Sequence, residues 1–447
     1  MTSPQLLDRQ RRLSGLPPAT RPPTWWRRMM RAPLFWLTAV LLPFYVYCIV
    51  SQFNMLHPDT EYPDGTVALG LNMESLRMGA YYAMWTALVW VLLFIWLDRF
   101  RPQRPLVWLL TFLWGACAST WISIHVNSWA GEAMNTTSAN ADTGTRAAIF
   151  IAPFAEEASK ATVLFLLIIL FRTGIVSRLS IVTLAGLSAI GFAFVENIIY
   201  YARAFVYATN TIDIEDPVAE MVQLVKLRGI YTSFGHPLFT MMTALGLAIA
   251  LGARSKIVRV VAPLAGFVVG AGGHMLFNGV ASSGGAADLR PQWFMSLGLV
   301  AMLVIMLVFT VVAQARLIRR RLGDYRRVGW LTDRDPIIFS SPFKRTKLHV
   351  ASLLRGPRRT WWPTAKFMRR ITELAYVREG MTRGTIGDGG DDRAKEILLE
   401  LEELRPSALT ETVGLKLLPP RRRKRLASAP PPQSPGPSGL GGNWPAP

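Results

Sequence analysis

Four apolar stretches of this chain, consecutive in sequence, carry side chains that could perform acid–base chemistry. These side chains are carboxylates, imidazoles and one carboxamide: Glu156, Glu157, Glu196, His236, His274 and Asn278. An ionisable group inside a membrane span costs at least about 2.5–3.5 kcal/mol on insertion scales, so its presence favours a functional role. A carboxylate that activates water, with His and Asn donors for the developing oxyanion, would be sufficient for peptide hydrolysis.

The two adjacent glutamates are expected to have different roles. Two neighbouring carboxylates in a low-dielectric site cannot both ionise easily, so we expect one of them to exchange a proton. Lys160 follows Glu156 by one helical turn and can hold that carboxylate ionised. Glu157 points about 100° away from Glu156 and is expected to orient a neighbouring helix. Lys160, Phe192 and Tyr200 are interpreted as supporting residues.

A metal ion at this cluster is one of two alternatives. A catalytic zinc site uses three protein ligands and an open water position. The available ligands here are Glu156, Glu196, His236 and His274. The sequence contains no compact zinc-binding motif such as His-Glu-x-x-His. The residues therefore leave a zinc-dependent and a metal-free mechanism open.

Long apolar runs predict an all-α, polytopic transmembrane bundle of about eight spans. A span needs about 20 apolar residues, and these runs lack the alternation of barrel strands. The expected spans are 34–53, 79–97, 105–126, 147–171, 181–203, 229–252, 257–281 and 293–315. Counted from the outer ends at about 1.5 Å per residue, Glu156, Glu196, His236 and His274 all lie about 10–14 Å deep. We therefore expect them to form one layer.

The composition excludes a soluble protein. Hydrophobic residues make up 51% and charged residues only 17%, too few charges to cover the surface of a soluble chain of this length. The net charge of +20 lies in the tails and alternate loops, which predicts contact with anionic lipids and no nucleic-acid partner. The same bias predicts a multi-pass plasma-membrane protein with both termini in the cytoplasm.

Composition also divides the chain into segments. These are a basic cytoplasmic segment over 1–33, a membrane domain over 34–315 with its catalytic core at 145–282, a basic helical tail over 316–430 and a disordered Pro/Gly-rich end over 431–447. Within the tail we expect an amphipathic piece around residues 361–376. A further helix is expected from Asp391, with Asp391 or Asp392 as the cap of the run over residues 394–404.

Four motifs, in order on consecutive spans, resemble those of the PrsW family of bacterial membrane proteases. They are Glu156-Glu157-x-x-Lys160, Phe192-x-x-x-Glu196-x-x-x-Tyr200, His236 and His274-x-x-x-Asn278, within about residues 145–282. The resemblance implies an intramembrane endopeptidase in which the glutamate pair and the last His–Asn motif are essential. It also implies a membrane-anchored substrate, such as an anti-sigma factor, that is cut near the extracytoplasmic face.

The PrsW family is distantly related to the type II CAAX prenyl endopeptidases and Abi-type proteins, which have a His where this chain has Glu196. That analogy favours a metal-free glutamate mechanism without a cofactor, with zinc as the alternative. The alternative function is a proton-coupled transporter that uses the same Glu and His residues as a relay. A carrier is expected to contain an internal repeat. The sequence shows none, and its polar layer is confined to four consecutive spans.

Overall fold

The structure, a computed structural model, is built almost entirely of helices. It describes residue 16 and residues 24–61, 67–100, 103–133, 141–170, 177–283, 290–354, 360–384, 386–387, 389–412 and 415. A single pair of short antiparallel strands, β1 (Thr60–Glu61) and β2 (Val67–Ala68), follows the first long helix among these residues. The end predicted over 431–447 and most of the segment predicted over 1–33 lie outside the described residues.

The helices form a membrane bundle followed by a smaller helical tail. The bundle contains α2 (Trp25–Met30), α3 (Pro33–Leu56), α4 (Met73–Leu97), η1 (Asp98–Phe100), α5 (Pro105–Leu113), η2 (Trp114–Ser119), α6 (Thr120–Ala133), α7 (Ala141–Phe150), α8 (Ala152–Leu170), α9 (Arg178–Thr209), α10 (Pro217–Val225), η4 (Lys226–Tyr231), α11 (Gly235–Gly252), α12 (Lys256–Ser283) and α13 (Arg290–Arg327). The tail contains α14 (Asp335–Phe339), α15 (Pro342–Leu354), α16 (Trp361–Thr382) and α17 (Gly389–Leu404). The tail helices predicted from residue 361 and from Asp391 are therefore confirmed as α16 and α17.

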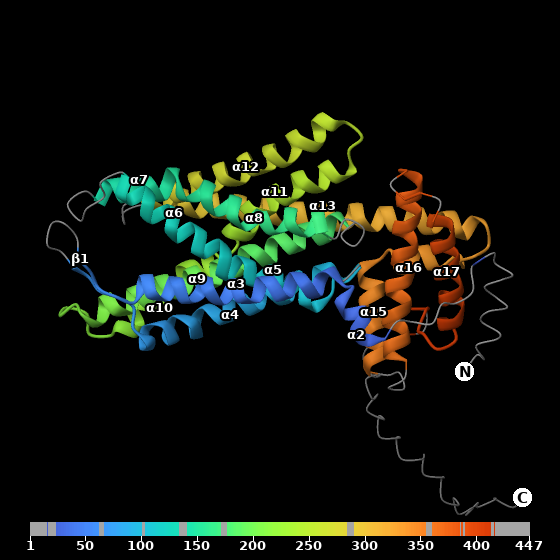
Figure 1. Cartoon of the computed structure of the whole chain (residues 1–447), viewed down its shortest axis with the longest axis horizontal. Helices are drawn as coiled ribbons and strands as arrows, with labels where there is room; N and C mark the ends of the chain where they lie inside the picture. Colours follow the sequence, from blue (N-terminus) through green and yellow to red (C-terminus); the bar gives the residue numbers. More distant parts are fainter. Residues whose placement is uncertain are drawn as a thin grey trace, which may run out of the picture.

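Seven helices in the described part of the chain are long and apolar enough to cross a membrane. They correspond to the predicted spans except 147–171, where the structure has α7 and α8. Helix α8 is too polar to be counted with the seven because it carries Glu156, Glu157 and Lys160. Helices α2 and α17 lie at the same end of the bundle (Figure 1), which requires an even number of crossings. Helix α8 therefore makes the eighth crossing.

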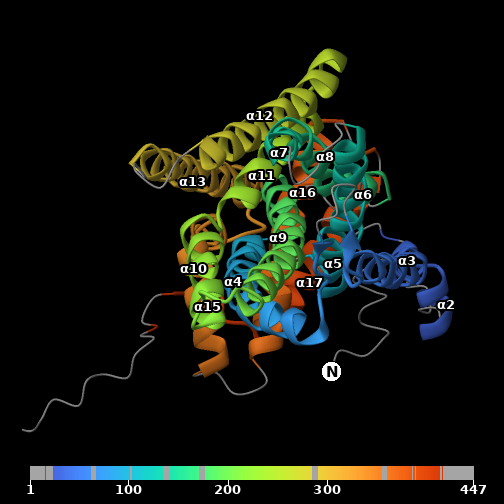
Figure 2. The same cartoon turned by 90° about the vertical axis from the view of Figure 1, so that its left-hand side faces the viewer.

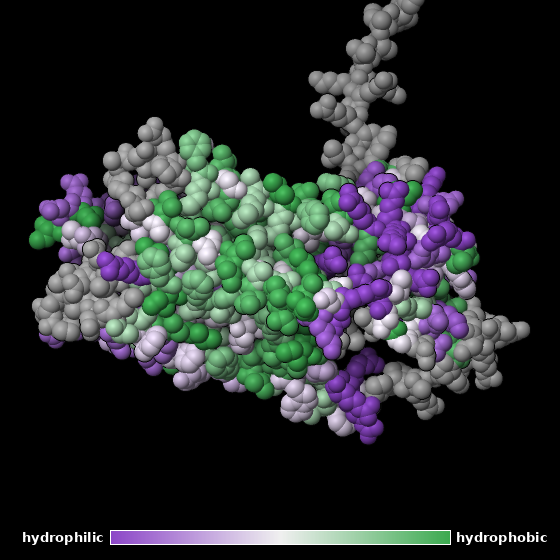
Figure 3. All heavy atoms as spheres, turned by 90° about the horizontal axis from the view of Figure 1, so that it is seen from above, coloured by the Kyte–Doolittle hydropathy of each residue, from purple (hydrophilic) through white to green (hydrophobic). Residues whose placement is uncertain are grey.

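The outer surface of the bundle is apolar, as contact with lipid requires. Figure 3 shows hydrophobic side chains over most of the bundle and hydrophilic ones over the tail. Large aliphatic side chains on the outer helices are exposed, among them Val40, Val89, Val260 and Ile305. A soluble monomer rarely exposes so wide an apolar surface. The polytopic helical bundle predicted from the sequence is confirmed.

Helix α9 lies at the centre of the bundle and packs against α4, α5, α8, α10 and α11 (Figure 2). Its first half is buried without a break from Leu179 to Ala193. Small residues allow the close approach: a Cβ on Gly191 would lie 2.0 Å from the carbonyl oxygen of Phe112 on α5. The central helix therefore has a fixed position, and it carries part of the candidate site.

The tail has its own hydrophobic core, which also includes the last turns of α13. Ile318 and Leu322 of α13 pack in this core with Phe339, Phe367 and Ile397. Helix α13 thus continues without interruption beyond residue 315, the predicted end of the last span. The tail is also bonded to the bundle, because the buried guanidinium of Arg345 donates to the carbonyl oxygens of Arg99 and Phe100.

Candidate active site

The buried face of α8 places an ammonium group between several acceptors. Lys160 Nζ lies 3.1 Å from Glu156 Oε2 and 2.9 Å from Glu157 Oε1, on the same helix. It also donates to His236 Nδ1 of α11 at 3.0 Å. The ring of Phe192 on α9 faces this ammonium, with its centroid 3.9 Å from Nζ. Lys160 is fully buried, and its contacts bring three helices together at one point.

Glu157 is the fully buried member of the glutamate pair. Besides Lys160, it contacts Thr240 of α11, whose hydroxyl donates to Glu157 Oε2 at 2.6 Å. His274 Nδ1 of α12 lies 3.0 Å from Glu157 Oε1. These contacts are consistent with the expectation that Glu157 orients neighbouring helices, since it joins α8 to both α11 and α12.

Glu196 forms a second ionic group beside the first. Its Oε2 lies 2.9 Å from His236 Nε2 and 2.5 Å from Arg228 Nη2 of η4. The same guanidinium donates through Nε to Asn197 Oδ1 at 2.9 Å and lies over the ring of Tyr200. Arg228 is therefore the ionic partner of Glu196.

His274 and Asn278 extend the site along α12. His274 is buried, stacks on Phe239 of α11 and has its Nε2 4.0 Å from Glu156 Oε2. The imidazoles of His236 and His274 stand at 90° with centroids 5.2 Å apart. Asn278, one turn further, donates to the carbonyl oxygen of Ala148 at 3.1 Å. The layer predicted from residue depth is therefore present in the structure.

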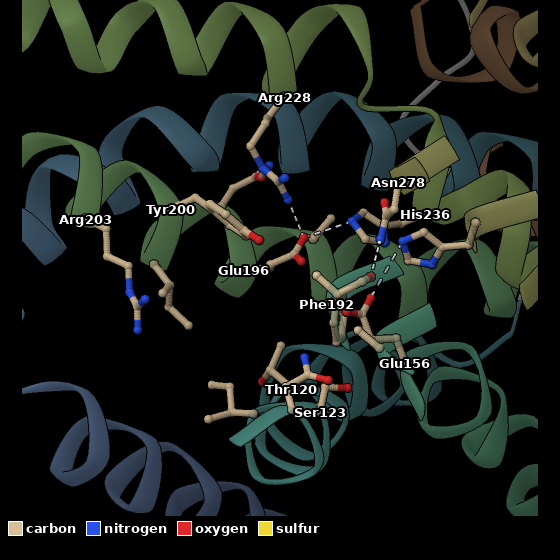
Figure 4. Close-up of a pocket in the computed structure, with 18 of the residues that line it drawn as sticks. Thr120, Ser123, Glu156, Phe192, Glu196, Tyr200, Arg203, Arg228, His236 and Asn278 are labelled. Carbon is tan, nitrogen blue, oxygen red and sulfur yellow. Dashed lines mark hydrogen bonds and ion pairs between the residues drawn. The ribbon is translucent and has the colours of Figure 1, made fainter. Parts of the chain in front are cut away.

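The cluster lies on the wall of a large cavity. The cavity has a volume of about 1400 Å³, and its lining includes Glu156, Glu196, His236, His274 and Asn278. Figure 4 shows Glu156, Glu196, His236 and Asn278 converging from different helices. Glu157 and Lys160 do not line the cavity. The cavity also reaches residues at the ends of α3 and α12, so it extends toward the end of the bundle opposite the tail (Figure 1).

Hydrogen bonds assign the tautomers of both imidazoles. Because carboxylates only accept, neutral His274 donates from Nδ1 to Glu157, and its Nε2 lone pair faces Glu156. Neutral His236 donates from Nε2 to Glu196 and accepts from Lys160 at Nδ1. Neither neutral ring has a second N–H to offer a substrate. Of the cavity-lining residues Glu156, Glu196, His236, His274 and Asn278, the one with an N–H left to donate is then Asn278.

The arrangement of donors fits a divalent metal ion. One ligand atom from each of Glu156, His236 and His274 lies within 4.8 Å of the others. A tetrahedral zinc ion would bring such atoms to about 3.4 Å from one another, so a small contraction would be enough. The Glu157–His274 bond is the carboxylate–histidine arrangement that supports metal-bound imidazoles. Glu196, the fourth ligand considered from the sequence, is bonded to Arg228 instead and is not part of this set.

Several residues of the site were not identified from the sequence. Thr240 and Phe239 hold Glu157 and His274 in position, and both are ordinary residues of an apolar span. The third span also contributes to the cavity, through Thr120, Ser123 and Asn127 of α6. Their spacing of three and four residues, which places them on one helix face, is the sequence signal that could have identified them.

Comparison with known proteins agrees with this geometry. The family described as PrsW family intramembrane metalloprotease matches residues 103–312. None of the curated proteins and none of the solved structures compared with the chain matched it. The matched region is wider than the 145–282 expected from the motifs, because it also includes α5, α6 and much of α13. Residues 103–312, which contain all four motifs, are thus similar to the PrsW family of intramembrane proteases.

Proposed function

We propose that this protein hydrolyses a peptide bond of a membrane-anchored protein near the extracytoplasmic face, with Glu156 in contact with the attacking water. The observation that carries this proposal is the division of the glutamate pair. Glu156 lines the cavity, whereas Glu157 is fully buried behind it. A carboxylate must be within hydrogen-bond reach of the water from which it removes a proton. Of the pair, Glu156 alone meets this condition.

The other residues position Glu156 and the substrate. Lys160 shares its single positive charge between the two glutamates and fixes the direction of the Glu156 carboxylate through its 3.1 Å contact. Glu157 holds His274 in the tautomer whose Nε2 faces Glu156. Asn278 retains one amide N–H that can donate to the oxyanion as the carbonyl becomes tetrahedral.

A metal ion is compatible with this assignment. Glu156, His236 and His274 would hold it, and when bound it would polarise the scissile carbonyl or lower the pKa of a bound water. Binding through His236 Nδ1 requires Lys160 to give up its bond to that nitrogen. Glu156 contacts the water position in both the metal-free and the metal-dependent mechanism.

The sidedness of the reaction is part of the proposal. The tail and both ends of the chain carry most of the basic residues, so we place them in the cytoplasm beside anionic lipids of the plasma membrane. The cavity extends toward the opposite end of the bundle. An extracytoplasmic cut in a single-span protein, such as an anti-sigma factor, agrees with that direction.

The test compares new protein N-termini and released extracytoplasmic peptides in cells that carry the wild type or Glu156→Gln at matched membrane abundance. The control is Glu132→Gln, which neutralises an exposed carboxylate on the same cavity. We expect at least one membrane protein to be cut in the wild type and the control but not in Glu156→Gln. Identical peptide profiles in all three strains would falsify the proposal.

Metal dependence is tested on purified protein in detergent. We would measure the metal content per chain in the wild type, His274→Ala and Glu132→Gln, and the cleavage rate before and after chelation. A stoichiometric metal that is lost in His274→Ala, with activity restored by metal addition, assigns the metal-dependent mechanism. Full activity after exhaustive chelation assigns the metal-free one.

A further inference from the structure

One face of α6 presents polar side chains to the cavity. Thr120, Ser123 and Asn127 lie on this face and line the cavity together with Glu156 on the facing wall. Figure 4 shows Thr120 and Ser123 on α6, across the cavity from Glu196 and Phe192. Ser123 is only 3% exposed. Ser123 Oγ and Asn127 Oδ1 are both buried, and neither has a hydrogen-bond partner among the described residues.

Unpartnered polar atoms at this position require an explanation. Most buried polar side-chain atoms in proteins have a hydrogen-bond partner, and leaving one without a partner is unfavourable. Thr120 satisfies its own hydroxyl by donating to the carbonyl oxygen of Ala116. Ser123 and Asn127, one turn further along the same face, do not use this local solution. Both residues line the cavity, so a rotation of either side chain would bring its unpartnered oxygen to a ligand there.

The position of this face is fixed relative to the catalytic cluster. Helix α6 continues from the π-helical segment η2, and such segments often occur at functional sites. A Cβ on Gly115 of η2 would lie 1.8 Å from the carbonyl oxygen of Ser188 on α9. This backbone-to-backbone contact prevents η2 from sliding against the helix that carries Phe192 and Glu196. The distance between the two walls of the cavity is therefore set by packing.

We propose that Ser123 and Asn127 bind the backbone of the substrate in extended conformation beside the scissile bond. Four residues of helix advance about 6 Å, and groups on one edge of an extended chain repeat every 6.4–6.8 Å or about two residues. Ser123 and Asn127 can therefore meet two successive groups on one edge of the chain. Asn127 Oδ1 accepts from a peptide N–H, and the Ser123 hydroxyl donates to a carbonyl or accepts from an N–H.

The chemistry of the substrate supports this assignment, which rests on the proposed function. A transmembrane helix must unwind locally to expose a peptide bond, and its freed N–H and C=O groups then need partners inside the membrane. The cavity of about 1400 Å³ exceeds the roughly 300–1,000 Å³ typical of small-molecule pockets. It is thus large enough for several residues of peptide between the α6 face and Glu156. The ligand is a main chain, so this contact is independent of substrate side chains.

The experiment measures the rate of each Glu156-dependent cut in cells that carry Ser123→Ala, Asn127→Leu or the double variant at matched membrane abundance. Loss of one hydrogen bond is expected to slow the cut about two- to tenfold, and loss of both about 4- to 100-fold. Ser119→Ala is the matched control, because its hydroxyl is equally buried and unpartnered but lies off the cavity. We expect the control to retain the wild-type rate.

A second measurement separates substrate binding from a structural role. Removing a buried polar atom that has no protein partner should leave the melting temperature in detergent unchanged or raise it. We therefore expect Ser123→Ala and Asn127→Leu to be slower but no less stable. Two results would overturn the α6 assignment, provided that Glu156→Gln still abolishes the cuts. One is a cleavage rate in these variants equal to that of Ser119→Ala. The other is a loss of rate that parallels a loss of stability. If no Glu156-dependent cut exists in the wild type, the proposed function fails first and takes this assignment with it.

Discussion

The substitution Glu157→Gln removes one charge and almost no volume from the centre of the bundle. Glu157 accepts from Thr240 at 2.6 Å and contacts Lys160 at 2.9 Å and His274 at 3.0 Å. A glutamine that keeps its oxygen on Thr240 turns its NH2 group toward Lys160 and His274, and this group can accept from neither. The substitution therefore tests whether this buried carboxylate both stabilises the bundle and orients His274.

The stability cost follows from these contacts. Breaking a buried ion pair from one side costs about 3–5 kcal/mol, and the retained Thr240 bond recovers about 1 kcal/mol. The expected loss of about 2–4 kcal/mol corresponds to about 2–4 °C in melting temperature for a chain of this length. Glu156→Gln should cost only about 1 kcal/mol, because Lys160 keeps its contacts to Glu157 and His236 and Glu156 lies at the cavity wall.

The same substitution should change the tautomer of His274. A glutamine amide that donates to His274 Nδ1 moves the imidazole proton to Nε2, the nitrogen that faces Glu156. Substituting an outer carboxylate of this kind typically costs about 10- to 100-fold in activity or metal affinity. We would record melting temperature, Glu156-dependent cleavage and the imidazole ¹⁵N shifts in detergent. The chain has only 5 histidines, so His274→Ala can identify the signal of His274. If Glu157→Gln has the same melting temperature as Glu156→Gln and His274 keeps its proton on Nδ1, the reasoning is refuted.

Three further predictions test the surroundings of the site. Arg228→Lys should slow cleavage about tenfold or more, because a lysine cannot bond both Glu196 and Asn197 as the guanidinium does; the cleavage assay above measures this. Gly115→Ala should lower the melting temperature or prevent folding, because its Cβ would meet the backbone of α9, whereas Gly131→Ala on the same span has open space and should not. Burial opposes ionisation of Glu379, but Arg321 and Arg383 outweigh it and hold the pKa of this carboxyl below its usual range. Its contribution to the stability of the tail is therefore complete above about pH 4.3. That contribution is lost as the pH falls through the folded-state pKa. The protection factors of the α16 amides, taken against the intrinsic exchange rate at each pH, should accordingly fall in acid for the wild type and be low already at neutral pH in Glu379→Gln.

The sequence predicted the bundle because its signals are long and consistent. Apolar runs of span length occur with basic loops on alternate sides, and a lipid solvent leaves helices as the available backbone solution. The cluster was predictable for a related reason. Glu156, Glu196, His236 and His274 are costly in a span, and counting residues from the span ends gave them the same depth. Chemistry and depth together were enough to place them in one layer.

The parts that the sequence did not predict depend on distances between helices. Arg228 is near a span end, where a basic residue is normally an interfacial anchor, and only the packing of η4 on α9 brings it to Glu196. Ser123 and Asn127 add only a small free-energy cost to membrane insertion, and hydroxyl and amide groups are common between membrane helices. The sequence alone therefore does not mark them as functional. Their role follows from facing a cavity without partners, and a cavity has no signature in a single helix. Glu156 and Glu157 are adjacent in sequence, and only burial distinguishes them.

The charges of the cluster connect the two mechanisms. Glu156, Glu157 and Glu196 face the cations Lys160 and Arg228, so with neutral imidazoles the cluster has one carboxylate more than it has cations. An uncompensated charge in a low-dielectric site is costly, and the cluster gains stability by taking up a proton or a cation. Glu157 and Glu196 each have a close cationic partner and other donors, whereas Glu156 shares Lys160 and faces the cavity. This charge imbalance supports the proposed role of Glu156 at the cavity wall in both the metal-free and the metal-dependent mechanism.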